Sequence, residues 1–344
     1  MKTKKVYVGM SGGVDSSLTA ALLVEQGYEV TGVYMKNWTQ DLPGMKCPWA
    51  DDLADAKRVA VQLGIDFKVF DFQKEYKQKV VDYMINEYKA GRTPNPDIMC
   101  NQEVKFKLFL DASLEDGADM IATGHYAQVE KGVLKKAVDE NKDQTYFLYR
   151  ITKKALEKTL FPLGGMKKTE VREQAKKRHL FTASKKESMG ICFVGSVGIR
   201  EFLSQYVITQ PGAIIDIQTR ETVGSHDGAI FFTLGQRHGL HVGGGLPYYV
   251  VSKDMKKNEV YVTRDLNDKE LWRKEIKLSD LHWIDQRPVN GQKLQVRMRH
   301  RAALIDAKLS DHTLLLSEPQ RAIATGQSAV LYDSSVVLGG GILS

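Results

Sequence analysis

Hydrophobic and polar residues follow a helix-strand alternation through the first two hundred of the 344 residues. Segments with helical spacing, at residues 15–26, 51–63 and 75–88, are separated by short apolar runs at residues 6–10, 29–35, 67–70 and 118–123. Gly27 and Gly64 follow the first two helices as stop signals. Repeated strand-helix-strand units predict a parallel sheet with helices on both faces, whose ligands bind at the carboxyl ends of the strands.

The pattern changes near residue 207. Short alternating runs predict strands in the remaining chain, and long helical periodicity is missing from it. These runs occupy residues 229–233, 248–252, 259–263, 294–298, 302–309, 313–316 and 328–332. We therefore expect three domains: an α/β nucleotide-binding domain at 1–206, a small central β domain at 207–268, and a β-barrel-like domain at 269–344. The last boundary lies in the polar run RDLNDKE.

Composition narrows the class of protein without naming a function. The chain is 42% hydrophobic and 26% charged, as in an ordinary globular protein, and its net charge of +7 suits a polyanionic partner. No apolar run reaches the roughly 18 residues that a membrane span needs, so we expect a cytoplasmic protein. Cys47, Cys100 and Cys192 form no CxxC pair, and His125 has no partner at HxxxH spacing. We predict no disulfide scaffold and no protein metal site.

A glycine-rich loop joins the first predicted strand to the first predicted helix. Two glycines permit the backbone to turn its N–H groups into one concavity, and the helix N-terminus adds its dipole. The loop lacks the GK[ST] of a Walker A sequence and is not GxGxxG. It predicts a phosphate cradle in which Asp15 would repel the ligand unless it caps the helix or shares a metal with the phosphates. The loop consists of Gly9, Met10, Ser11, Gly12, Gly13, Val14, Asp15, Ser16 and Ser17.

The stretch PNPDIMC, residues 94–100, predicts a stiff turn followed by a helix. Thr93 and Asn95 each precede a proline, which favours extended backbone at both. Asp97 is expected to cap the helix, with Cys100 in the first turn on the same side. The helix N-terminus lowers a thiol pKa and a carboxylate raises it, and the sequence leaves open which effect wins. Asp97 is accordingly a cap, a candidate general base, or both.

These motifs together resemble a known family. SGGVDSS is similar to the pyrophosphate loop of ATP pyrophosphatases, which activate a substrate oxygen as an adenylate. NPDxxCN at residues 95–101 and GICF at 190–193 resemble the two cysteine segments of the bacterial tRNA-specific 2-thiouridylases. TGHYA, KDQTYFL, TLGQR and GQSAV, which begin at residues 123, 142, 233 and 326, are also similar to segments of that family. The resemblance runs through essentially the whole chain.

The resemblance implies a mechanism with two cysteines. Cys192 would carry a persulfide received from a protein donor, either a cysteine desulfurase or a sulfur relay carrier. The terminal sulfur would attack the activated C2 of the wobble uridine, and Cys100 would then form a Cys100–Cys192 disulfide that a reductant clears. The basic segment before Cys192 favours a thiolate there. Cys47 has no role in this scheme.

The family also implies contacts for ATP, Mg²⁺ and tRNA. Besides loop residues 9–16, Met35 and Gly124 would contact ATP, and Asn95, Pro96 and Asp97 would contact the target base. The tRNA contacts would be His125, Lys142, Asp143, Gln144, Arg299, His300 and Gln327. Independently of the resemblance, Arg297, Arg299 and Arg301 would share one face of a strand, and three like charges there favour a phosphate backbone as partner.

Two other functions fit parts of the sequence. Another ATP pyrophosphatase could adenylate a small molecule, but it would have no use for paired cysteines or a basic β domain. A nonenzymatic RNA-binding protein would not account for SGGVDSS and PNPDIMC in one chain. Release of pyrophosphate that depends on added tRNA distinguishes the three.

Overall fold

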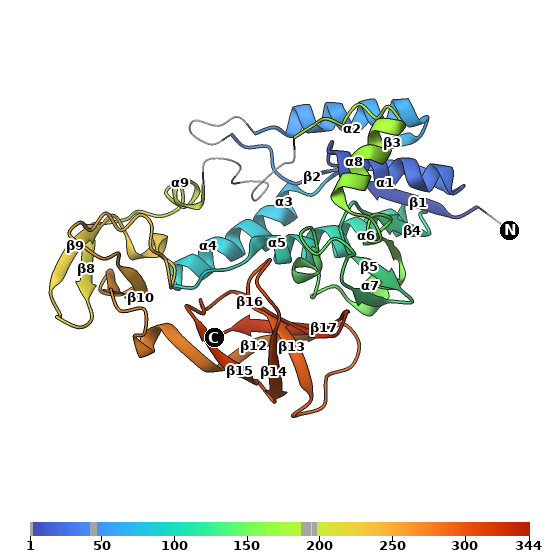
Figure 1. The fold of residues 1–344 in the computed structure, drawn as a ribbon. Helices are drawn as coiled ribbons and strands as arrows, with labels where there is room; N and C mark the ends of the chain where they lie inside the picture. The colour runs from blue at the N-terminus through green and yellow to red at the C-terminus, as the bar shows by residue number, and fades with distance from the viewer. Residues whose placement is uncertain (1–2, 42–46, 187–193, 195–197) are drawn as a thin grey trace.

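The chain folds into an α/β unit followed by two β units (Figure 1). The computed structural model describes residues 3–41, 47–186, 194 and 198–344. Cys192, and with it the expected Cys100–Cys192 disulfide, lies outside the described residues.

The α/β unit is built on a five-stranded parallel sheet, as the strand-helix alternation predicted. The strand order is β3-β2-β1-β4-β7, so β1 is central and the chain crosses over between neighbours. Its strands are β1 (Lys5–Gly9), β2 (Glu29–Lys36), β3 (Asp66–Asp71), β4 (Met120–Ala122) and β7 (Thr159–Leu160). The carboxyl ends of β1, β2 and β4 therefore meet at one edge of the sheet.

Helices cover both faces of this sheet because alternate strand residues are apolar on both sides. Val6 and Val8 pack against α1 (Val14–Glu25) and α2 (Trp49–Leu63), whereas Tyr7 and Val33 face the opposite core. Gly64 ends α2 with a left-handed φ of 65°, which confirms the predicted stop. The other α/β helices are α3 (Gln73–Tyr76), α4 (Asp82–Lys89), α5 (Pro96–Met99), α6 (Phe109–Glu115), α7 (Lys153–Glu157), α8 (Lys168–Lys177) and α9 (Ile199–Leu203).

Two π-helical segments join these helices into longer ones. Segment η1 (Lys77–Val81) connects α3 to α4, so the helix expected at 75–88 is one continuous element. Segment η2 (Cys100–Leu108) likewise connects α5 to α6 and begins at the cysteine of PNPDIMC. Figure 1 shows α4 and α5 between the parallel sheet and the C-terminal β unit. Such π-helical segments are frequent at functional sites.

The central β unit is a four-stranded sheet in the order β10-β11-β8-β9. One prediction here was wrong: residues 229–233 were expected to form a strand, but Ala229–Phe231 is a 3₁₀ turn that buries Ala229 and Ile230. An apolar run of this length marks burial rather than strand geometry, and Gly228 before it has a φ of 158°. The strands are β8 (Gly212–Asp216), β9 (Thr222–His226), β10 (Tyr249–Asp254) and β11 (Glu259–Thr263).

The C-terminal unit is a barrel, because β12 pairs with both β15 and β17 and so closes the sheet. A hairpin of the α/β unit, β5 (Gln128–Glu130) with β6 (Val133–Lys135), extends this sheet by pairing with β17, which the sequence did not indicate. The barrel strands are β12 (Trp272–Trp283), β13 (Lys293–Arg297), β14 (Ile305–Ser310), β15 (Thr313–Arg321), β16 (Ser328–Asp333) and β17 (Val336–Leu343); short 3₁₀ turns lie at Thr145–Phe147 and Lys269–Leu271.

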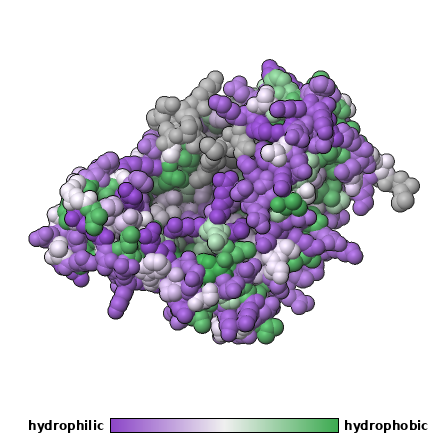
Figure 2. All heavy atoms as spheres, viewed as in Figure 1, coloured by the Kyte–Doolittle hydropathy of each residue, from purple (hydrophilic) through white to green (hydrophobic). Residues whose placement is uncertain are grey.

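The surface in Figure 2 is mainly hydrophilic, and it is hollowed between the lobe that contains β8–β11 and the α/β unit. Within the described part of the chain, every helix is too short or too polar to cross a bilayer.

Candidate active site

The glycine-rich loop forms the predicted strand-turn-helix cradle. Gly12 has a φ of 73°, and a Cβ there would lie 2.4 Å from the carbonyl oxygen of Asp52, so only glycine fits. Gly13 precedes α1, whose first N–H groups receive no side-chain cap. The exposed Ser11 lies beside Ser16, with 3.4 Å between their hydroxyl oxygens. Free helix N–H groups and a hydroxyl in one concavity suit a phosphate chain.

Asp15 is neutralised by a lysine that the sequence did not single out. Lys168 Nζ, at the start of α8, lies 2.7 Å from each carboxylate oxygen of Asp15, and the Tyr126 hydroxyl donates to the same carboxylate at 2.8 Å. Asp15 therefore neither caps α1 nor depends on a metal to offset its charge. Lys168 thus places a cation beside Asp15 at the loop. No local pattern distinguishes it from other lysines, because it lies 153 residues away.

The neighbouring strand ends complete this edge of the sheet. Gly124 follows β4, and a Cβ there would lie 2.9 Å from the Ser16 backbone nitrogen, so the two loops touch. Met35, near the end of β2, lies against Gly9, where an added Cβ would be 2.9 Å from the Met35 methyl carbon. The family resemblance predicts that the glycine-rich loop, Met35 and Gly124 contact one nucleotide. The structure places these three close together. They contribute glycine backbone and a thioether beside the phosphate cradle.

The turn of PNPDIMC is stiff, but its cap is Asn95 rather than Asp97. The Asn95 side-chain oxygen accepts hydrogen bonds from the N–H groups of Asp97 and Ile98 at 3.2 and 3.4 Å, and Pro96 occupies the first helical position. The prediction that Asp97 caps the helix was wrong. Proline is favoured at that first position, which makes the residue before it the cap.

Because Asn95 is the cap, the Asp97 carboxylate does not cap the helix and is available for proton transfer. Burial raises the pKa of the Asp97 carboxyl, and the charge of Lys105 partly offsets this. Cys100 begins η2 and is buried at 4% exposure. A carboxyl with a raised pKa close in sequence to a thiol is suited to proton transfer.

His125 is neutral and lies between the glycine-rich loop and segment η2, which begins at Cys100. It follows Gly124, which touches the phosphate loop, and its ring packs 5.6 Å from that of Phe106 on η2. Burial holds the pKa of the His125 imidazole well below its usual value, and nearby Lys105 lowers it further. Its Nδ1 lies 2.8 Å from the Thr123 hydroxyl. An uncharged imidazole would contact RNA through hydrogen bonding or stacking and not as a cation.

Of the other two cysteines, Cys47 is among the described residues and Cys192 is not. Burial raises the pKa of Cys47, whose thiol lies 3.7 Å from the Trp38 carbonyl oxygen, so Cys47 is a poor nucleophile at neutral pH. Lys185, just before the undescribed residues around Cys192, pairs with Asp52 and Asp55 of α2 at 2.8 and 2.7 Å. One of the lysines expected to favour a Cys192 thiolate is therefore already paired with carboxylates.

In the loop 142–144, Asp143 is buried and its two neighbours are half-buried. Asp143 is 3% exposed; it accepts from the Ala137 N–H and the Thr145 hydroxyl and pairs with Arg297 at 3.0 Å. The Gln144 side chain accepts from the Tyr126 N–H at 2.9 Å. The Asp143 side chain thus has a structural role across the boundary between the α/β unit and the barrel, and its contact with tRNA stays a prediction. Lys142 is half-buried beside it.

The expected stripe of three arginines does not form. Strand β13 ends at Arg297, which points inward to Asp143 and lies over the Tyr332 ring, while Arg299 and Arg301 are exposed beyond the strand end. The spacing argument failed because it assumed a longer strand. Arg299 also donates to the Ala322 carbonyl.

His300 and Gln327 both reach toward the helix that carries Cys100. The His300 ring lies 4.5 Å from that of Phe147, whose carbonyl accepts from Asn101, the residue after Cys100. Burial lowers the pKa of His300, with Arg301 and Arg297 lowering it further. Gln327 Nε2 donates to the carbonyl oxygens of Thr93 and Pro94 at 2.8 and 3.5 Å. These two expected tRNA contacts therefore also touch, directly or through one residue, the segment around PNPDIMC.

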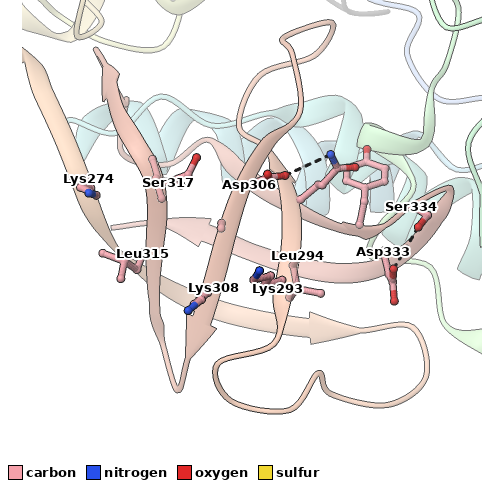
Figure 3. A pocket seen from close by; sticks show the side chains of 13 residues that line it. Lys274, Lys293, Leu294, Asp306, Lys308, Leu315, Ser317, Asp333 and Ser334 are labelled. Atoms are coloured by element: carbon pink, nitrogen blue, oxygen red, sulfur yellow. Dashed lines mark hydrogen bonds between the residues drawn. The ribbon is translucent and has the colours of Figure 1, made fainter.

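A separate cavity of about 700 Å³ lies on the outer face of the barrel (Figure 3). Lys274, Lys293 and Lys308 line it from three strands, together with Asp306 and Asp333, and none of the site residues predicted from the sequence belongs to it. Among the described residues, no group of three His, Cys, Asp or Glu side chains could hold a metal ion.

Comparison with known proteins gives matches over nearly the whole chain. Three family models match in order: a tRNA methyl transferase HUP domain at residues 4–196, a tRNA methyl transferase PRC-barrel domain at 200–264, and an aminomethyltransferase beta-barrel domain at 273–343. The tRNA-specific 2-thiouridylase MnmA of Neisseria meningitidis serogroup C is 48% identical, over 99% of this chain and 95% of that protein. Those of Listeria monocytogenes serotype 4b and Bacillus subtilis are 46% and 43% identical, each over 98% of this chain and 94% of the relative.

Proposed function

The chain belongs to the family of tRNA-specific 2-thiouridylases, and we propose that it adenylates the C2 oxygen of a tRNA wobble uridine and replaces that oxygen with sulfur carried on Cys192. It is a tRNA sulfurtransferase that uses ATP and forms 2-thiouridine. The names of the three family models refer to methyl or aminomethyl transfer, but a methyltransferase would not need a pyrophosphate loop or the cysteine motifs.

One observation carries the proposal. Gly124 lies against the phosphate loop at Ser16, and the next residue, His125, packs on Phe106 of the helix that begins at Cys100. The segment 123–125 thus joins the ATP-binding loop to the helix of the nucleophile. This arrangement suits a reaction in which one substrate atom is first adenylated and then attacked by sulfur.

In the proposed first step, the uridine C2 oxygen attacks the α-phosphorus of ATP and pyrophosphate leaves. The N–H groups at the start of α1 and Ser11 would hold the β- and γ-phosphates, and Lys168 would offset the charge of Asp15 beside them. Mg²⁺ is implied by the family and would take most of its ligands from the phosphates and water, because the described residues contain no carboxylate cluster for it.

In the proposed second step, the terminal sulfur of a Cys192 persulfide attacks C2 and AMP leaves. The Cys100 thiolate then attacks the Cys192 sulfur, which releases 2-thiouridine and forms a Cys100–Cys192 disulfide that an external thiol reduces. Asp97 would accept the proton of the Cys100 thiol or of the substrate, and Asn95 and Pro96 would hold the base. The persulfide sulfur would come from a cysteine desulfurase or a relay carrier.

The proposed tRNA contacts are the exposed Arg299, the half-buried Lys142, and the neutral His125, Gln144, His300 and Gln327. Lys142 and Arg299 would bind phosphates, whereas the neutral side chains are suited to bases and sugar hydroxyls.

The proposal is tested by incubating the full chain with ATP, unmodified tRNA and a persulfide donor, followed by mass spectrometry of the nucleosides. We expect 2-thiouridine and a release of pyrophosphate that requires tRNA. Cys100→Ser and Cys192→Ser should each abolish the product and leave ATP binding intact. Pyrophosphate release without tRNA would instead favour a small-molecule ligase, and full activity of either cysteine variant would refute the assigned roles.

A further inference from the structure

Thr93, which opens the turn of PNPDIMC, is held by residues from both β units. Its N–H donates to the Thr325 carbonyl at 2.8 Å, and its hydroxyl lies 3.1 Å from that of Thr233 in the central unit. Its carbonyl accepts from Gln327 Nε2 at 2.8 Å. We call Thr233, Thr325 and Gln327 the Thr93 clamp. Three parts of the chain more than 90 residues apart therefore meet at one residue, four positions before Asp97.

The close fit around the clamp leaves no room for side chains at two glycines. A Cβ on Gly326, whose φ is 90°, would lie 2.9 Å from the Thr93 backbone nitrogen. A Cβ on Gly235, whose φ is 79°, would lie 2.3 Å from that of Ala322. The loop 322–327 is thus pressed between the central unit and the turn, and Arg299 braces it by donating to the Ala322 carbonyl.

The turn needs partners from outside its own segment. Pro94 and Pro96 have no N–H groups, and the Asn95 side chain satisfies only the first N–H groups of the helix. The carbonyls of Thr93 and Pro94 find their donor in Gln327, more than 230 residues away. The local sequence fixes the helix cap, whereas the carbonyls of Thr93 and Pro94 depend on this distant donor.

We propose that Gln327 and Thr233 are positioning residues, which fix the turn so that Asp97 and Cys100 face the target base. The inference rests on the proposed function, and it extends it by making the two β units part of the catalytic geometry. Gln327 then acts on catalysis through the Thr93 and Pro94 carbonyls, whether or not it also touches tRNA. Loss of the clamp loosens the Cys100 helix before any RNA binds.

The first test measures alkylation of Cys100 by iodoacetamide in the full chain without tRNA, with each cysteine peptide followed by mass spectrometry. For Gln327→Ala we expect the Cys100 rate to rise about tenfold, because local opening exposes its buried thiol. The buried Cys47 reports general loosening and should keep its rate. Gln295→Ala, a surface glutamine on β13, is the matched control and should change neither rate. Equal rises at Cys47 and Cys100, or no rise at either, would overturn the proposal.

The second test separates positioning from tRNA binding. In Gln327→Ala and Thr233→Val, kcat for thiolation should fall about tenfold. In Thr233→Val, which alters no proposed tRNA contact, KM for tRNA should stay within about twofold. Thr233→Ser keeps the hydroxyl and should restore kcat. A large rise in KM with unchanged kcat and Cys100 alkylation would show a direct tRNA contact instead and would overturn the positioning role. Wild-type chain that makes no 2-thiouridine would refute the proposed function, while the alkylation test would still decide the clamp.

Discussion

Lys168 and Asp15 form an ion pair at the glycine-rich loop, in which Lys168 Nζ lies 2.7 Å from both carboxylate oxygens of Asp15. Lys168 is 11% exposed at its side chain and Asp15 33%, so solvent screens the pair only in part. The pair brings a cation to the loop and keeps Asp15 compatible with a polyanionic ligand.

Lys168→Ala should lower kcat/KM for ATP about a hundredfold, because it removes a cation and leaves Asp15 to repel the phosphates. Pyrophosphate release under tRNA saturation measures this effect. The double variant Lys168→Ala/Asp15→Ala should recover part of the loss, since the unpaired carboxylate is gone. Lys176→Ala, on the exposed side of the same helix, serves as the control. Equal losses in the two lysine variants would contradict the assignment.

Asp97→Asn should lower thiolation by about 10²–10⁴ if Asp97 transfers a proton, and it should also change stability in a pH-dependent way. Burial raises the pKa of Asp97 in the folded state, so ionisation costs stability as pH rises from the unfolded pKa through the folded one. Asparagine does not ionise, so the Asp97→Asn variant does not lose this stability as pH rises. Its Tm relative to wild type should therefore increase as pH rises above about 4, the ordinary pKa of an aspartate.

Asp116→Asn provides a control of opposite sign for that experiment. Hydrogen bonds from Lys68 and Tyr7 lower the pKa of Asp116, so its ionised form contributes stability that is lost as pH falls through the folded pKa. Relative to wild type, this variant should become less stable as pH rises. A Tm difference for Asp97→Asn that does not depend on pH would contradict the buried carboxylate.

Arg297→Ala should destabilise the fold by about 3–5 kcal/mol, because it leaves the carboxylate of Asp143 buried without its cation. Chemical denaturation followed by fluorescence measures the loss. Arg301→Ala removes an exposed charge and should change the free energy of unfolding by less than about 0.5 kcal/mol. Similar stabilities for the two variants would refute the structural role of Arg297.

Arg299→Ala should instead act on tRNA affinity. Removing one phosphate contact should reduce the slope of log affinity against log salt concentration by about one. Filter binding or fluorescence anisotropy over a range of salt concentrations measures this slope. An unchanged slope would remove Arg299 from the tRNA contacts.

Cys47→Ser should retain full thiolation activity at neutral pH, because burial raises the pKa of Cys47 and leaves little thiolate. The same nucleoside assay measures this activity beside Cys100→Ser, which should be inactive. Loss of activity in a Cys47→Ser variant that keeps wild-type Tm would give Cys47 a part in sulfur transfer.

Local sequence determined those parts of this protein that depend on neighbouring residues. The alternation of strands and helices predicted the parallel sheet, and the glycine pair between β1 and α1 predicted the anion cradle. Even the helix cap could be read locally: Pro96 at the first helical position designates Asn95, although Asp97 was expected. The family resemblance followed from motifs of the same local kind.

Only the tertiary structure decided which distant residues serve each motif. Lys168 pairs with Asp15, Arg297 pairs with the buried Asp143, and Gln327 donates a hydrogen bond to the Thr93 carbonyl. Each of these contacts joins residues more than 150 positions apart. Periodicity and propensity describe how a segment folds on itself, whereas these side chains are selected by how the finished domains pack. The charges and hydrogen bonds around Asp15 and Thr93 were therefore decided by that packing.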